Sequence, residues 1–251
     1  MPPITKPIDT PSAHPRPAVT GAAGAYRVDG AAVPPASAAR PDVQISAIGA
    51  RLGKAEGAQA GTLSGDQVRA NIDTINYPLT PENKARMAQQ VPQPADAAAL
   101  ASAAAANAYV DNLGGPNPFA GLSREQLWTV ANDDSGTFTT NERYAAYRQA
   151  YDEEQAWRTK AVADAMREYH ETGKLTDFFK SALAHFDTLP AAEQALYPSD
   201  YAADLGGKIA LDFNYYTHRP HGEPGAAAGS IAALHGNDDG VKGMLGLPDV
   251  F

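Results

Sequence analysis

Residues 139–173 read TTNERYAAYRQAYDEEQAWRTKAVADAMREYHETG, and this stretch decides the fold. Thr139, followed three residues later by Glu142, has the pattern of a capping box, which begins a helix. Gly173 is the type of residue that ends one. Between these signals, apolar side chains recur near one helical stripe: Tyr144, Tyr147, Tyr151, Trp157, Ala161, Ala165 and Tyr169. We therefore predict a long central helix that forms the spine of the fold.

Shorter helices are predicted on both sides of this spine. A capping residue precedes each of six further segments with helical character: Ser64, Thr80, Asp96, Ser123, Thr176 and Ser199. No segment has the β-branched alternation of a strand. The predicted class is all-α, an irregular helical domain built around the long helix.

Composition divides the chain into four predicted parts. Nine of the 20 prolines lie in residues 1–41, so residues 1–62 are predicted to be a disordered leader rich in Pro and Ala. Residues 63–111 form a small helical arm, and residues 116–217 form the main helical domain. Residues 218–251, rich in Gly, Pro and His, are predicted to be a loose, irregular tail.

Charge and cysteine content exclude several functional classes. The 251-residue chain has a formal charge of −9, and beyond residue 62 it has 14 Lys and Arg against 25 Asp and Glu. Such a surface repels phosphate backbones, so no nucleic-acid partner is expected. The absence of cysteine removes thiolate catalysis and Cys-ligated metals. Without an apolar run long enough to span a bilayer, we expect a cytoplasmic protein, with leaderless export of an unfolded end as an alternative.

Residues 132–142, NDDSGTFTTNE, have the spacing of a calcium-binding loop. If Gly136 is the sixth of twelve positions, Asp133 is the third, Ser135 the fifth, Thr137 the seventh and Glu142 the twelfth. Ala131 stands at the first position, where such loops normally have Asp. Over residues 122–147 the chain resembles an EF-hand, a resemblance that implies Ca²⁺ bound through Asp133, Ser135, Thr137 and Glu142. With so few side-chain oxygens we expect a Kd of about 10⁻⁴ to 10⁻³ M.

Apolar residues in the first third of the chain suggest a partner-binding surface. They follow helical spacing through a polar linker: Ile45, Leu52, Val68, Ile72 and Ile75. Residues 42–90 resemble the flagellar anti-sigma factors, small bacterial proteins that are disordered alone and fold onto a sigma factor. The resemblance implies that these five side chains contact a protein partner; the alternative is an ordinary amphipathic arm.

Catalytic signatures are missing from the sequence. There is no G-x-S-x-G elbow and no P-loop, and the neighbouring Asp152, Glu153 and Glu154 read as a solvated helix face. We therefore assign no catalytic residue and expect a non-catalytic interaction or regulatory protein of bacterial type, acting through amphipathic helical faces. A weak calcium-binding module is the first alternative. An exported effector or hydrolase whose residues converge from distant positions is the second.

Overall fold

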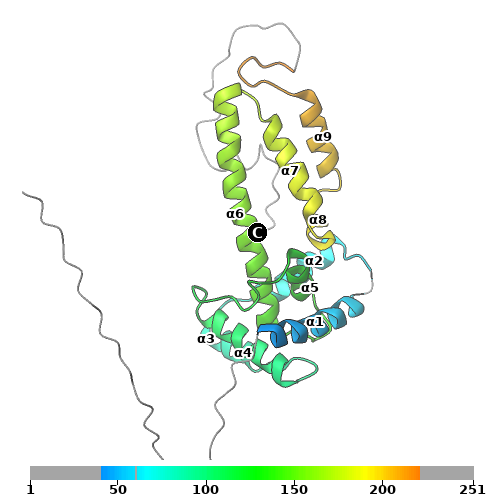
Figure 1. Ribbon diagram of the computed structural model, residues 1–251, viewed down its shortest axis with the longest axis vertical. Coiled ribbons are helices and arrows are strands. Elements are labelled where there is room, and N and C mark those ends of the chain that lie inside the picture. Colours follow the sequence, from blue (N-terminus) through cyan, green and yellow to red (C-terminus); the bar gives the residue numbers. More distant parts are fainter. Residues whose placement is uncertain (1–40, 60, 221–251) are drawn as a thin grey trace, which may run out of the picture. The chain divides into compact units, whose positions relative to one another are not determined.

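The computed structural model describes residues 41–59 and 61–220, and its regular structure over this range is entirely helical (Figure 1). Nine helices lie in these residues: α1 (Pro41–Ala58), α2 (Gly65–Ile75), α3 (Pro81–Ala88), α4 (Ala97–Asp111), α5 (Arg124–Ala131), α6 (Thr140–Thr172), α7 (Thr176–Thr188), α8 (Ala191–Gln194) and α9 (Tyr201–Leu211). The predicted all-α class is confirmed. Most of the predicted leader, residues 1–40, and nearly all of the predicted tail, residues 221–251, lie outside the described residues.

Helix α6 is the predicted spine, and both of its predicted ends are confirmed. Thr139 caps its first turn, and the Glu142 side chain completes the box by bonding back to the Thr139 amide. Gly173 ends it with a positive φ of 73°. A Cβ at Gly173 would lie 2.6 Å from the ring of Tyr216, so the position requires glycine for its space as well as for its backbone.

The predicted caps hold for the helices before α6 and fail for two after it. Ser64 and Ser123 form complete capping boxes, and Thr80 and Asp96 cap α3 and α4. The N-cap residues of α7 and α9 are Leu175 and Asp200, and among the described residues neither uses its side chain as a cap. Thr176 and Ser199 are therefore not the caps of these helices.

Helix α1 lies where the sequence predicts a disordered leader. Its glycines at 49, 53 and 57 lower its intrinsic helix propensity, which is why the sequence does not reveal it. Contacts with α4 and α5 stabilise it instead, because Leu52 and Ala55 are buried against them. The leader prediction is wrong for residues 41–58.

The first core joins the predicted arm to the main domain. It combines buried residues of α1, α2, α4, α5 and the N-terminal half of α6, including Val68, Ile75 and Tyr109 from the arm with Trp128 and Tyr147 from the domain. Helices α2 and α4 both contact α6. Residues 63–111 therefore share one core with α5 and α6, and are not a separate arm.

The second core lies along the C-terminal half of α6. It contains Ala161, Ala165 and Tyr169 of α6, together with Phe179 of α7 and Leu205 of α9. Figure 1 shows α7 beside this half of α6 and α9 on the far side of α7, and α7 contacts both helices. Within the described ranges, none of the helices has the length and apolar character that a membrane span requires.

Candidate functional site

The loop between α5 and α6 is braced by the carboxylate of Asp133. One oxygen accepts the amide (3.2 Å) and the hydroxyl (2.6 Å) of Ser135, and the other accepts the amide of Phe138 at 2.8 Å. Gly136 has the positive φ of 77° that the turn needs. Asp133 and Ser135 thus bond within the loop, in the manner of the Asx turns that connect helices.

Glu142 is fully buried, and its carboxylate accepts hydrogen bonds from three segments of the chain. Arg51 of α1 donates to both oxygens, at 2.8 and 2.9 Å. Ser102 of α4 donates its hydroxyl to Oε1 at 2.6 Å. Thr139 donates its amide (2.9 Å) and hydroxyl (3.1 Å) to Oε2. This carboxylate joins α1, α4 and the first turn of α6.

The Arg51 guanidinium is held on its edge and on its face. Besides the two bonds to Glu142, Nη2 donates to the backbone carbonyl of Thr137 at 2.6 Å. The guanidinium carbon lies 4.1 Å from the centre of the Phe138 ring, in cation–π geometry. A planar guanidinium can form a bidentate ion pair and stack on a ring at the same time, so this site suits arginine and not lysine.

Two of the four predicted calcium ligands therefore converge on a cation, and that cation is a guanidinium. The Thr137 carbonyl and the Glu142 carboxylate both bind Arg51, whereas Asp133 and Ser135 bond within the loop. Over the described residues, no cluster of three or more His, Asp or Glu side chains is arranged to hold a metal. Calcium binding stays a prediction, and it would require Ca²⁺ to displace Arg51.

Four of the five residues predicted to contact a partner lie in the protein's own core. Leu52, Val68, Ile72 and Ile75 are all buried. The side chain of Ile45 lies outside the described residues. Partner contact through these side chains stays a prediction, and it requires a helix to leave the core first.

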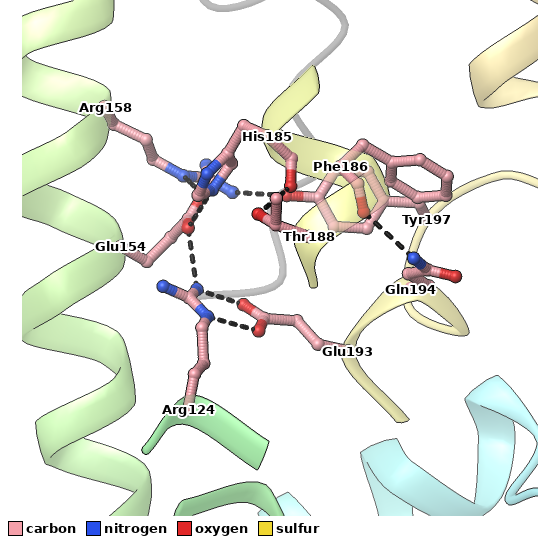
Figure 2. Close-up of polar contacts among 9 residues, drawn as sticks. All are labelled: Arg124, Glu154, Arg158, His185, Phe186, Thr188, Glu193, Gln194 and Tyr197. Atoms are coloured by element: carbon pink, nitrogen blue, oxygen red, sulfur yellow. Dashed lines mark hydrogen bonds and ion pairs between the residues drawn. The ribbon is translucent and has the colours of Figure 1, made fainter. Parts of the chain in front are cut away.

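A second buried polar cluster lies where α5, α6, α7 and α8 meet, and Figure 2 shows its side chains pointing toward one another. Arg124 donates to both oxygens of Glu193, one of them at 2.7 Å, and also to Glu154 at 2.7 Å. Arg158 donates to the other oxygen of Glu154 at 2.9 Å. Both carboxylates are fully buried, so the prediction that Glu154 belongs to a solvated face is wrong.

His185 completes this cluster from α7. Its Nε2 lies 2.8 Å from Oε2 of Glu154, and its ring stacks on Trp157 with centroids 3.7 Å apart and planes 10° apart. Glu154 and Arg158 also form an i,i+4 ion pair along α6, as part of this larger network. The sequence hides this network because its other members come from other helices.

The two carboxylates of the cluster have pKa shifts in opposite directions. Burial alone would raise the pKa of Glu154, but hydrogen bonds from His185 and Arg158 outweigh it and lower the pKa to about 2. For Glu193, burial outweighs the bonds and the charge of Arg124, so its pKa is raised. Such a pair could serve acid–base chemistry. Both groups are closed off from solvent, however, so the arrangement is suited to fixing helices together.

A surface cavity of about 330 Å³ lies between α6 and α7. Several of the charged groups that line it are engaged within the protein. Asp164 pairs with Lys160 and Arg167, and Glu168 accepts the backbone amides of Asp177 and Phe178. Glu171, which also lines the cavity, is exposed.

Sequence reasoning missed the arginines and the serine that complete both clusters. Arg51 and Glu142 are 91 residues apart, and Arg124 and Glu193 are 69 apart, so no local spacing pairs them. Ser102 lies within an alanine-rich helix. The only local signal for the first cluster is Arg51, a single arginine among the glycines at 49, 53 and 57.

The chain matches no protein-family model, no curated protein and no solved structure. Its function must therefore be argued from the two clusters.

Proposed function

We propose that this protein is a non-catalytic interaction protein, and that it binds a protein partner through α1 when this helix is released from the core. The observation that carries the proposal is the docking of α1: from residue 48 on, where its side chains are described, it rests on the buried Arg51–Glu142 ion pair and a small set of apolar side chains. Among the described side chains of α1, Leu52 and Ala55 are buried with Arg51, and Ile48 packs against the same core. A released α1 would offer Leu52 to a groove that accepts an amphipathic helix.

Three glycines support the release of α1. Gly49, Gly53 and Gly57 are exposed, and no described atom lies within 4 Å of the place where a Cβ would stand at any of them. Each glycine costs about 1 kcal/mol of helix stability relative to alanine. A helix with this weakness and few buried contacts opens at a lower free energy than the whole domain unfolds.

Helix α2 is held more firmly, which restricts the proposal to α1. Val68 and Ile75 are completely buried in the first core. At the start of α2, Gly65 lies so close to α8 that a Cβ would stand 2.3 Å from the carbonyl oxygen of Ala195. Leu52 is therefore the predicted partner contact that release of α1 makes available most readily.

Two matched variants test the release. Replacing Gly49, Gly53 and Gly57 with alanine fills open space and stabilises α1, so its amides should exchange with deuterium roughly 100-fold more slowly. Arg51→Gln removes the ion pair and should raise α1 exchange by roughly tenfold or more. Hydrogen exchange followed by mass spectrometry reads both effects, with α9 as the internal reference.

The amount of partner captured should follow how readily α1 is released in each protein. In cross-linking from bacterial lysate, Arg51→Gln should capture a given partner most strongly, the wild type less and the alanine variant least. The proposal fails if α1 exchanges only when the whole protein unfolds. It also fails if the three proteins capture the partner equally.

A calcium-binding module is the second candidate, favoured by the convergence of the Thr137 carbonyl and the Glu142 carboxylate on one nitrogen of Arg51. Calcium and Arg51 would then compete for the same oxygens. A titration followed by the fluorescence of Trp128 should show tighter Ca²⁺ binding in Arg51→Ala than in the wild type. If Arg51→Ala shows no saturable change up to a few millimolar Ca²⁺, this candidate is excluded.

A further inference from the structure

The loop before α6 forms a binding site for the two terminal nitrogens of a guanidinium group. It offers three acceptors to the fork of Arg51, the two Glu142 oxygens at 2.8 and 2.9 Å and the Thr137 carbonyl at 2.6 Å. The Phe138 ring covers the face of the cation at 4.1 Å. Each of these groups belongs to residues 137–142 and none to α1.

The acceptors are held in place by parts of the protein other than α1. Ser102 and Thr139 orient the Glu142 carboxylate, and Asp133 fixes the Phe138 amide. The Phe138 ring packs edge-on against Phe119, with centroids 6.4 Å apart. The site should therefore keep its shape when α1 is released.

An empty site would be unfavourable, because removal of Arg51 leaves the buried Glu142 carboxylate without a cation. A buried charge that has lost its partner is strongly unfavourable, so the site favours rebinding of a guanidinium. Lysine is a poorer replacement because its ammonium cannot form the planar bidentate pair. The acidic chain, with a formal charge of −9, also attracts cationic segments.

We infer that the loop is an arginine receptor, and that an arginine side chain of the protein partner replaces Arg51 in the complex. This inference rests on the proposed function, because it requires α1 to be released. Arg51 is then the resident ligand of the site, and partner binding is an exchange of one arginine for another. The Phe138 face and the bidentate acceptors set the preference for guanidinium over ammonium.

Chemical rescue tests the receptor without requiring the partner. In Arg51→Ala, methylguanidinium chloride should bind saturably, with a Kd on the order of millimolar for so small a ligand. It should raise the melting temperature of the variant as its concentration passes the Kd, by mass action. Methylammonium chloride at equal ionic strength should give at least a tenfold weaker effect. The double variant Arg51→Ala with Glu142→Gln should lose the saturable response.

Direct binding is read by saturation-transfer NMR on the ligand methyl group, and folding by far-ultraviolet circular dichroism. Arg51→Met keeps more apolar packing and replaces Arg51→Ala if the alanine variant loses its helical signal. If neither variant folds, the wild type is titrated with arginine amide and with lysine amide. Faster exchange of α1 amides with arginine amide alone supports the receptor, and equal exchange with both overturns it.

The outcomes separate this inference from the proposed function. Saturable binding of methylguanidinium to Arg51→Ala, without release of α1 in the wild type, would show that the loop binds a guanidinium but would overturn partner binding through α1 and, with it, the exchange of Arg51 for a partner's arginine. Release of α1 in a variant that responds equally to methylguanidinium and methylammonium would overturn the receptor and leave the proposed function standing.

Discussion

At the scale of single residues, three glutamates within residues 41–59 and 61–220 are completely buried, and each pairs with an arginine from another segment. They are Glu142, Glu154 and Glu193. A buried ion pair adds little stability compared with a well-packed apolar pair, but the loss of one partner is costly because the other charge is left uncompensated. These pairs therefore specify which helices meet more than they raise the overall stability.

Glu154 makes the free energy of unfolding depend on pH in the acid range. Its pKa is about 2 in the folded protein and 4.5 in its ordinary state. Above 4.5 the carboxylate is ionised in both states and its full contribution is present. As pH falls from about 4.5 to about 2, the unfolded chain binds the proton first, so the free energy of unfolding should decrease. Urea unfolding at a series of pH values measures this decrease.

The control is Glu154→Gln, which cannot titrate. It should be less stable than the wild type at neutral pH because Arg124 and Arg158 lose their charged acceptor, and its stability should depend less steeply on pH between 4.5 and 2. Glu193 acts in the opposite direction, since a raised pKa favours the protonated folded state in acid. Equal slopes for the wild type and Glu154→Gln would refute the assignment.

How well each residue could be predicted depends on the distance to its partner along the chain. Glu142 was predictable as the N3 residue of a capping box, because the N-cap residue Thr139 lies only three positions before it. Its second role, binding Arg51, depends on a contact across 91 residues. Residues 133–142 show the spacing of a calcium loop, and the sequence alone does not reveal that a guanidinium binds to two of its predicted ligands.

At the scale of helices, α7 is capped by a neighbour and not by its own sequence. The Glu168 carboxylate on α6 accepts the amides of Asp177 and Phe178, at 2.8 and 2.9 Å. Glu168→Ala should lower the free energy of unfolding by about 1 kcal/mol, the usual effect of a lost N-cap. Chemical denaturation measures the loss.

Glu171→Ala is the matched control, because Glu171 is exposed on the same helix one turn later. It should change stability by less than about 0.5 kcal/mol. Amides in the first turn of α7 should exchange faster in Glu168→Ala alone. The tertiary cap would be refuted by equal exchange in the two variants.

Helices could be predicted where their signals are local. The capping boxes of α2, α5 and α6 are contiguous patterns, and the structure confirms all three. Thr176 was the predicted cap of α7, but its hydroxyl donates to Asp212 at 2.5 Å instead. Helix α1 was missed because its glycines oppose a helix and its stability comes from tertiary contacts, which outweigh propensity.

At the scale of the whole described unit, two apolar cores share one helix. Ala150 of α6 belongs to the first core and Ala161 to the second, and Glu154 lies between them. Arg124 connects Glu154 to Glu193, and His185 connects Glu154 to α7 (Figure 2). This polar cluster therefore couples the packing of the two cores.

Arg124→Met should weaken this coupling, because it leaves two buried carboxylates without their shared cation. We expect a loss of about 3 to 5 kcal/mol and a separation of the unfolding of the two cores. The chain has two tryptophans: Trp128 is in the first core, and Trp157 packs beside the second. Single-tryptophan versions made with Trp128→Phe or Trp157→Phe therefore report the cores separately.

In the single-tryptophan proteins that keep Arg124, the urea transitions reported by Trp128 and Trp157 should coincide, as expected for a cooperative unit. With Arg124→Met, the midpoint reported by Trp157 should fall below that reported by Trp128, because α7 and α8 lose their polar link to α5. Arg167→Met is the matched control, since Arg167 pairs with Asp164 on an exposed face of α6. It should shift both midpoints by little and by the same amount. Coincident transitions in Arg124→Met would mean that apolar packing along α6 is enough to couple the cores.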